Sequence, residues 1–270
     1  MTNYILSEVN IYPVKSLGGI SLNEAEVTDR GLKYDRRWML VDENGKFITQ
    51  RMYPQMSQII VEIKNDFLKF IHKQNSNLSF SIPVENYNNG HDNVVVWDDT
   101  VNAEYVSKEA DEWFREVLKI NCRLVHMPEE AARLVDKKYA SKNEIVSFAD
   151  AYPFLVIGQS SLDDLNSRLI EKVLMNRFRP NLVFTGGEPF NEDKMKNFKI
   201  GDVVFYPVKP CARCVVTTIE QESGIKGKEP LQTLSSYRTI NNKVMFGQNL
   251  LHEGKGIIKT GSTLDNIEWK

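Results

Sequence analysis

Two of the chain's three cysteines, Cys211 and Cys214, are separated by two residues, one of which is Arg213. The thiolate form of cysteine is both a soft metal ligand and a nucleophile, and a neighbouring guanidinium favours that charged form. Pro210 precedes the pair and interrupts regular structure there. This segment is therefore where redox or metal chemistry is most expected.

The spacing of the two cysteines does not by itself select one chemistry. C-x-x-C occurs in redox dithiols, in half of a structural zinc site, and as a pair of structural residues. Zinc would need two more ligands, and the remaining candidates are Cys122 and four scattered histidines, none paired at ligand spacing. A thioredoxin-like dithiol opens a helix, whereas the β-branched residues 215–219 predict a strand. From the residues alone, structural cysteines, a dithiol, zinc and another metal all stay open.

Length and composition describe an ordinary globular protein. The chain has 270 residues, 41% hydrophobic and 26% charged, with a net charge of -2, enough for one large or two modest domains. This charge gives no reason to expect nucleic acid or an anionic membrane as a partner. Three cysteines do not make a disulfide framework, and no stretch resembles a signal peptide or a membrane span. We therefore expect a cytoplasmic protein that binds neither nucleic acid nor membrane.

The elements that must position the cysteines begin with strands. Residues 4–100 contain short strand-like runs, which suggest a small barrel or sandwich. Among them, residues 37–49 predict a hairpin around an Asn-Gly turn. A helix is predicted over residues 107–119, because its apolar residues form one stripe and Ser107 can cap it. Cys122 follows in an apolar strand and is expected to be a buried core thiol.

The second half mixes strands with a helix. Residues 153–157 and 181–184 predict buried strands. Between them, residues 160–174 predict a helix that opens with a serine and an acidic residue three positions later. Residues 198–205 predict a turn entering a strand, and that strand leads to Cys211.

Eight short motifs follow one another along the chain. They are IYPVKS at 11–16, DRRW at 35–38, LNSRL at 165–169, FRPN at 178–181, CARC at 211–214 with TT at 217–218, KEPLQTL at 228–234, SYR at 236–238 and FGQ at 246–248. In this order they resemble the MOSC family, in the branch of the mitochondrial amidoxime reducing component and its bacterial relatives. The resemblance covers nearly the whole chain. It implies an α+β, mainly β fold, with an N-terminal MOSC β-barrel domain (residues 1–126) packed on a C-terminal MOSC β-barrel domain (residues 127–270) with flanking helices.

The resemblance also implies a molybdenum cofactor, molybdenum chelated by molybdopterin, held between the two domains. Motif position implies Cys214 as the catalytic residue and the ligand to the metal, whereas Cys211 receives no role. Arg213 is expected to help keep the Cys214 thiol ionised. Arginine suits both phosphate oxygens and heterocycle edges. The residues that match the family's cofactor contacts are Lys15, Ser16, Arg36, Arg51, Asp150, Arg179, Asn181, Arg213 and Gln248, with Asn249 as a weaker match.

The implied reaction is the two-electron reduction of N-hydroxylated small molecules to an amine or amidine plus water, with the chemistry carried by the cofactor. A ferredoxin-like [2Fe–2S] cluster needs four cysteines, and the chain has three. No glycine-rich dinucleotide fingerprint is visible either. We therefore expect a separate electron-donor protein, of the flavoprotein, ferredoxin or cytochrome type.

Two other interpretations stay open. In one, the protein is a non-catalytic molybdenum-cofactor carrier or a sulfur-handling accessory protein. In the other, Cys211 and Cys214 form a dithiol or zinc site and no pterin binds. Metal content and the response to artificial electron donors distinguish the three.

Overall fold

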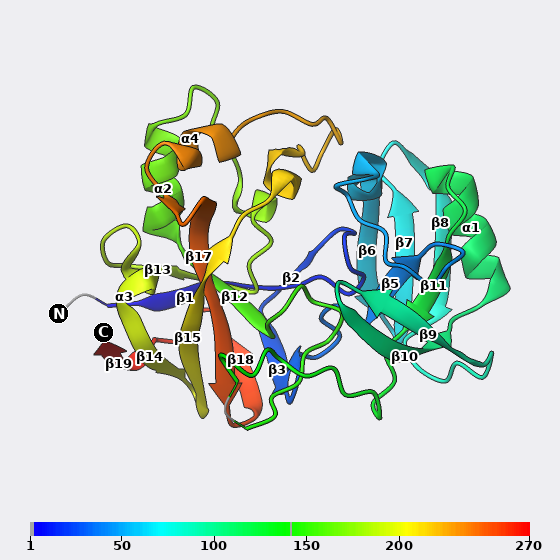
Figure 1. The fold of residues 1–270 in the computed structure, drawn as a ribbon, viewed down its shortest axis with the longest axis horizontal. Helices are drawn as coiled ribbons and strands as arrows, with labels where there is room; N and C mark the ends of the chain where they lie inside the picture. The colour runs from blue at the N-terminus through cyan, green and yellow to red at the C-terminus, as the bar shows by residue number, and fades with distance from the viewer. Residues whose placement is uncertain (1–2, 141) are drawn as a thin grey trace.

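The computed structural model describes residues 3–140 and 142–270, and it is mainly β, with 43% strand and 15% helix. Figure 1 shows two lobes side by side. The N-lobe contains the strands and helix of residues 38–126, and the C-lobe contains residues 154–270 together with the first strands of the chain. The predicted fold class, α+β and mainly β with flanking helices, is confirmed.

One large sheet organises the C-lobe. Over the described residues its strand order is β19-β14-β15-β17-β12-β13-β1-β2, with β16 paired to β17, and a smaller sheet has the order β18-β3-β4. The strand bounds are β1 (Ile5–Ile11), β2 (Ile20–Leu22), β3 (Glu24–Thr28), β4 (Gly31–Leu32), β12 (Phe154–Gly158), β13 (Leu182–Thr185), β14 (Met195–Ile200), β15 (Val203–Ala212), β16 (Thr239–Ile240), β17 (Lys243–Glu253), β18 (Gly256–Lys259) and β19 (Asp265–Trp269).

Two sheets form the N-lobe, with the orders β5-β11-β10-β9 and β6-β7-β8 within the part of the chain that is described. Helix α1 (Lys108–Leu118) packs against β8 and β11. The strand bounds are β5 (Trp38–Val41), β6 (Ile59–Lys64), β7 (Phe67–His72), β8 (Asn75–Pro83), β9 (His91–Val96), β10 (Asp99–Tyr105) and β11 (Arg123–His126), and a 3-10 helix, η1, covers Pro54–Gln58.

The helices of the C-lobe are short and lie around the sheet (Figure 1). They are α2 (Gln159–Ser167), α3 (Asn191–Lys194) and α4 (Leu231–Ser235), with 3-10 turns η2 (Met175–Arg177) and η3 (Val215–Thr218). Among the helices of the described residues, none has the length and apolar character needed to cross a membrane.

The first strand of the chain is part of the C-lobe sheet. β1 runs antiparallel to β13, with Val9 opposite Leu182, although the two residues lie far apart in sequence. Both are fully buried in one apolar cluster, and this burial stabilises the pairing. Because β1 leads straight into residues 12–18, the pairing fixes that segment where the lobes meet. The domain boundary expected after residue 126 stays a prediction.

Helix α1 confirms the helix predicted over residues 107–119. The Ser107 Oγ accepts a hydrogen bond from the Ala110 amide at 3.1 Å, which satisfies one of the free N–H groups at the helix start. Phe114 and Leu118 lie buried in the N-lobe core, and Cys122 is buried beside them as predicted. Burial raises the pKa of the Cys122 thiol to about 12, so this cysteine is inert.

The helix predicted over residues 160–174 forms, but the predicted end is wrong, because α2 stops at Ser167. The Asn166 side chain accepts from the Val173 amide at 2.8 Å and donates to the Val173 carbonyl at 3.0 Å. These two bonds close residues 167–173 into a loop, which competes with further helical turns.

The strand predicted over residues 215–219 is wrong, because these residues form η3. The Thr217 hydroxyl donates to the Cys214 carbonyl at 3.0 Å, and the Thr218 hydroxyl donates to the Val215 carbonyl at 2.8 Å. Local side-chain bonds of this kind favour a tight turn over an extended strand, despite the β-branched composition.

The hairpin predicted over residues 37–49 forms only in part. Its turn is present, with Gly45 at φ +73° and the Asp42 amide donating to the Lys46 carbonyl at 2.8 Å. The second arm, however, meets the first through a single bridge between Val41 and Phe47, and β5 pairs along its length with β11. The longer ladder to β11 decides the register of β5.

Gly247 in β17 has a left-handed backbone in a tightly packed position. Its φ is +79°, and a Cβ there would lie 2.7 Å from Ile157 Cγ1 and 2.9 Å from the Val156 carbonyl oxygen. We predict that Gly247→Ala lowers the free energy of unfolding by roughly 2–5 kcal/mol, since backbone strain and overpacking add. Urea unfolding measures this change.

Gly261→Ala is the matched control. Gly261 has φ +85°, but no described atom lies within 4 Å of the position of an added Cβ. Only the backbone penalty of about 1–2 kcal/mol is expected. Equal losses of unfolding free energy in Gly247→Ala and Gly261→Ala would show that packing at Gly247 does not contribute to the destabilisation.

Candidate functional site

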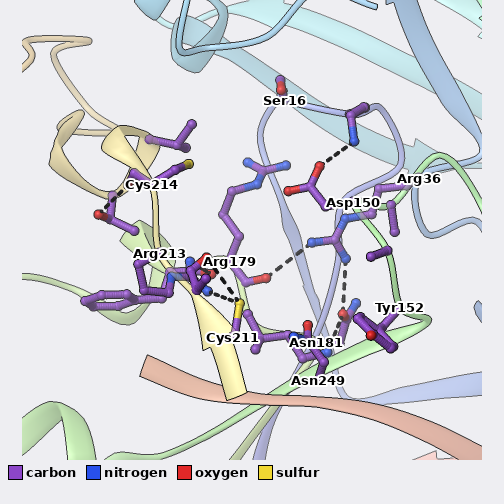
Figure 2. A pocket seen from close by; sticks show the side chains of 18 of the residues that line it. Ser16, Arg36, Asp150, Tyr152, Arg179, Asn181, Cys211, Arg213, Cys214 and Asn249 are labelled. Atoms are coloured by element: carbon purple, nitrogen blue, oxygen red, sulfur yellow. Dashed lines mark hydrogen bonds and ion pairs between the residues drawn. The ribbon is translucent and has the colours of Figure 1, made fainter. Parts of the chain in front are cut away.

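A cavity that is partly open to solvent lies between the lobes. Its walls come from the segment after β1, the loops at residues 49–51 and 149–155, residues 178–181, and the end of β15. Figure 2 shows the cysteine pair and Arg213 on one side, facing Ser16 and Asp150 on the other. The sequence-predicted residues that line this cavity are Lys15, Ser16, Arg36, Arg51, Asp150, Arg179, Asn181, Arg213 and Cys214.

Gln248 is the predicted contact that the structure places elsewhere. Its side chain is 1% exposed, and its Nε2 donates to Asp193 Oδ1 at 2.7 Å, away from the cavity lining. Its neighbour Asn249 lines the cavity instead. Successive side chains of a strand point to opposite faces, so of these two neighbouring predicted contacts only Asn249 faces the cavity.

Lys15 is a buried lysine in the cavity wall. It is 5% exposed, and its Nζ donates to Asp150 Oδ1 at 2.6 Å and to the Phe148 carbonyl at 2.7 Å. Burial lowers the pKa of Lys15 to about 8, and the Asp150 carboxylate opposes this by favouring the ammonium form. Lys15 is therefore charged at neutral pH but titrates far below an ordinary lysine. Asp150 faces the open space, with 74% of its side chain exposed.

Arg36 is held by a buried carboxylate and a buried amide. Its Nη1 donates to Asp35 Oδ2 at 2.6 Å and to Asn181 Oδ1 at 3.1 Å. Asp35, 2% exposed, also accepts from the Tyr12 amide at 2.8 Å, and Asn181 donates to the Asn10 carbonyl at 3.1 Å. This network links the end of β1 to residues 35–36 and to the start of β13, so the guanidinium has one orientation.

The ring of Tyr12 lies against two guanidinium groups. The central carbons of Arg36 and Arg179 are 4.4 Å and 4.2 Å from its centroid, within the range of cation–π attraction. Arg179 Nη1 also donates to the Leu17 carbonyl at 2.6 Å. Burial and the nearby Arg36 charge lower the pKa of Arg179 to about 10, so Arg179 remains charged at neutral pH.

The backbone at these cations is strained. Ser16, Arg36 and Arg179 have φ values of 68°, 49° and 55°, in the left-handed region that side chains other than Asn, Asp and Gly rarely adopt. Residues kept in such conformations cluster at ligand clamps and active sites. Three such residues at one cavity agree with a functional role for it.

The two cysteines have different surroundings, and Arg213 does not lie beside Cys214 as was predicted. Arg213 Nη1 donates to the Cys211 Sγ at 3.0 Å, and its Nη2 donates to the Phe178 carbonyl at 2.7 Å. The guanidinium thus lies against the first cysteine, not against Cys214 as the sequence suggested. Cys214 is exposed at the start of η3, where its sulfur is open to a ligand. Cys211 is half-buried and already has a partner.

The lining fits an anionic, sulfur-bound group. Within the described residues, its cations are Lys15, Arg36, Arg51, Arg179 and Arg213, against the carboxylate of Asp150. The Arg213 Nε is buried without a hydrogen-bond partner in the described structure, which leaves one donor for a ligand. Residues 3–140 and 142–270 contain no cluster of three or more His, Cys, Asp or Glu side chains suited to a metal ion. A metal at this cavity would need ligands from outside those protein side chains.

Sequence reasoning missed three residues that build the site. Tyr12 and Asp35 lie inside the IYPVKS and DRRW motifs, so the motifs that supplied Lys15 and Arg36 also held the signal for them. Arg133, which is 5% exposed, donates to the Ser147 carbonyl at 3.0 Å and fixes the loop that bears Asp150. Arg133 lies in a stretch of mixed charges, and nothing in that pattern indicates a residue of the site.

We predict that Lys15 Nζ titrates near pH 8, and that Asp150→Asn lowers this pKa further, because the variant removes a charge that favours the ammonium. Nitrogen-15 NMR of lysine side chains follows the titration, and Lys15→Gln assigns the signal by its loss. A pKa unchanged in Asp150→Asn would mean that the ion pair does not form in solution.

The comparisons with known proteins agree with this architecture. The model of the MOSC N-terminal beta barrel domain matches residues 4–121, and that of the MOSC domain matches residues 143–265. The chain is 34% identical to mitochondrial amidoxime-reducing component 1 of Mus musculus, covering 95% of this chain and 80% of that protein. It is 35% identical to mitochondrial amidoxime reducing component 2 of Rattus norvegicus, covering 95% and 81%.

A second group of relatives is longer. The chain is 31% identical to the molybdenum cofactor sulfurase of Arabidopsis thaliana, covering 93% of this chain and 33% of that protein. Both groups match this chain at similar identity over nearly its whole length, and the amidoxime reducing components match over most of their own length. The chain therefore belongs to the MOSC family, in the branch that includes the mitochondrial amidoxime reducing components.

Proposed function

We propose that this protein is a molybdenum-cofactor-dependent reductase of N-hydroxylated small molecules, producing an amine or amidine and water. The observation that carries the proposal is the exposed thiol of Cys214 in the same cavity as the cations Lys15, Arg36 and Arg179. A soft ligand and a set of fixed cations suit a pterin cofactor that bears both a metal and a phosphate. The names of the amidoxime reducing relatives support the choice of substrate.

The side chains divide the work of holding the cofactor. Cys214 would be the protein ligand to molybdenum, and the arginines would bind the phosphate and the edges of the pterin. Asn181 and Asp150 would contact the pterin, with Asn181 already fixed through Arg36 and the backbone. When bound, the cofactor supplies the two-electron redox chemistry.

The protein also supplies a proton-holding group. Reduction of an N–OH group to N–H with release of water consumes two electrons and two protons. Lys15 holds a proton at Nζ below about pH 8, and Asp150 beside it faces the open cavity. We assign Lys15 the task of supplying a proton to the substrate's hydroxyl, while Asp150, which would also contact the pterin, favours its ammonium form.

The electrons come, in this proposal, from a separate protein of the flavoprotein, ferredoxin or cytochrome type. The described side chains that line the cavity include no two-electron reductant besides the cysteine thiols. The location in the cytoplasm remains a prediction from the sequence.

A second candidate function follows from the sulfurase relatives. In this alternative the chain is a non-catalytic cofactor carrier or a sulfur-handling accessory protein, and Cys214 binds the cofactor only in transit. Cofactor would then exchange readily, and artificial electron donors would give no turnover.

We predict that Cys214→Ser lowers molybdenum content and abolishes reduction of benzamidoxime by reduced methyl viologen, because the hydroxyl is a harder and far less acidic ligand than the thiol. Metal analysis and a product assay measure the two effects. Partial retention of metal is compatible with the proposal, since the cations still hold the phosphate and pterin. Full metal and full activity in the variant would refute the ligand assignment.

Cys122→Ala is the matched control for this experiment. Cys122 is buried in the N-lobe core, away from the cavity, so its loss should leave molybdenum content and turnover unchanged. Wild-type protein that holds molybdenum but gives no turnover with methyl viologen would favour the carrier.

We predict that purified protein does not reduce benzamidoxime with NADH or NADPH alone. The sequence contains no glycine-rich dinucleotide fingerprint, so we expect nicotinamide to be unable to deliver its hydride. Activity should appear when a flavoprotein or cytochrome donor system is added. Turnover on NADH or NADPH alone would contradict the need for a separate donor.

A further inference from the structure

The β9–β10 hairpin ends in a tryptophan with an unfavourable backbone conformation. Val96 pairs with Asp99, so Trp97 and Asp98 form the turn, and Trp97 has φ +57°. Glycine is preferred at turn positions with positive φ, because a side chain there crowds the backbone. A bulky residue kept in that conformation requires an explanation from its contacts.

Trp97 contacts two residues of the cavity wall. Its Nε1 donates to Asp150 Oδ1 at 3.2 Å, and the same oxygen accepts from Lys15 Nζ at 2.6 Å. The central carbon of the Arg51 guanidinium lies 4.4 Å from the centroid of the Trp97 ring. Asp150 and Arg51 both line the cavity, whereas Trp97, 40% exposed, stands behind them at its edge.

Trp97 is the nearer of two rings that contact Arg51, since the Phe47 ring, which also packs on Trp97, lies 5.9 Å from the same guanidinium carbon. The Arg51 Nε makes a long hydrogen bond, 3.4 Å, to Thr49 Oγ1, and over residues 3–140 and 142–270 no carboxylate pairs with its guanidinium. Stacking leaves the edge of a guanidinium free to donate hydrogen bonds. Trp97 therefore orders a long cationic side chain without neutralising it.

The turn that bears Trp97 is itself fixed to the Asp150 loop. Arg133 is 5% exposed, and its Nε donates to Asp99 Oδ2 at 2.7 Å. Its Nη2 donates to the Asp150 carbonyl at 3.1 Å. This buried arginine sets the distance between the hairpin and the loop, so the indole N–H meets the carboxylate in one geometry. Trp97 also shares its left-handed backbone with three residues of the cavity, Ser16, Arg36 and Arg179.

We propose that Trp97 is a positioning residue of the cavity, which acts through Arg51 and Asp150. Its ring face directs Arg51 toward a bound anionic group, and its N–H holds the Asp150 carboxylate against Lys15. The strained turn is retained because it places one indole in contact with both Arg51 and Asp150. This inference rests on the proposed function only in taking the cofactor as the bound group.

The first experiment measures cofactor retention in the purified holoprotein. We expect Trp97→Gly to speed the loss of molybdenum and pterin during incubation on the order of tenfold, as removal of a supporting contact does at other metal sites. Trp97→Phe, which keeps a ring for Arg51 but lacks the N–H, should lose cofactor at an intermediate rate. Trp269→Gly is the matched control, since Trp269 is 46% exposed and lies in β19, and it should behave as wild type.

Thermal unfolding separates positioning from a merely structural role. Glycine fits φ +57° better than tryptophan does, so Trp97→Gly should fold, with an unfolding midpoint within ~3 °C of wild type. A large drop in the midpoint with unchanged cofactor loss would overturn the proposal. A double variant adds a further check, because Trp97→Gly should add little to Arg51→Ala if Trp97 acts through Arg51. If the effects of Trp97→Gly and Arg51→Ala on cofactor loss were fully additive, Trp97 would not act through Arg51.

The second experiment needs no cofactor. In cofactor-free protein, the fluorescence emission of Trp97 is obtained by subtracting the emission of Trp97→Phe from that of the wild type. Arg51→Ala should increase quenching of this emission by acrylamide, because it uncovers the ring face. Unchanged quenching would overturn the stacking on which the inference stands. If wild type fails to reduce benzamidoxime but the quenching and retention results hold, the proposed reaction fails and the role of Trp97 survives.

Discussion

The concentration of positive charge in one cavity is the constraint on which the rest of the structure depends. Lys15, Arg36, Arg51, Arg179 and Arg213 line the same space, and like charges held together in a partly buried site repel each other. The protein offsets this repulsion differently at each position. Lys15 and Arg36 each pair with a carboxylate, and Arg51 and Arg179 each lie against an aromatic ring. Arg213 donates to a thiol and to a backbone carbonyl. Much of the charge therefore remains available to an anionic ligand.

The route of the chain follows from the same constraint. β1 is paired deep in the C-lobe sheet, so residues 12–18 cross directly to the seam between the lobes. The network of Asp35, Arg36 and Asn181, with the backbone of residues 10–12, then joins three separate segments of the chain. Each hydrogen bond is of ordinary strength, but removing one partner would leave a buried charge or amide unpaired, which is costly. These bonds therefore hold the side chains of the site in one arrangement.

The two cysteines illustrate how neighbours in sequence acquire different chemistry. Cys211 lies within β15 with a guanidinium against its sulfur, whereas Cys214 stands exposed at the start of η3. One thiol is thus occupied and the other is open, as a protein ligand to a soft metal must be. This difference supports the reductase over a symmetrical dithiol, in which both sulfurs would need to approach one another.

The sequence by itself determined the mainly β fold, helix α1 and the charged residues that line the cavity, because short motifs and apolar periodicity are local properties of the chain. Tertiary structure decided which face of β17 meets the cavity, and it decided the placement of Arg213, whose guanidinium lies between Cys211 and the distant Phe178 carbonyl. It also decided the role proposed for Trp97, whose contacts come from residues 51 and 150. These features depend on segments that meet only after folding, and no local pattern encodes such meetings.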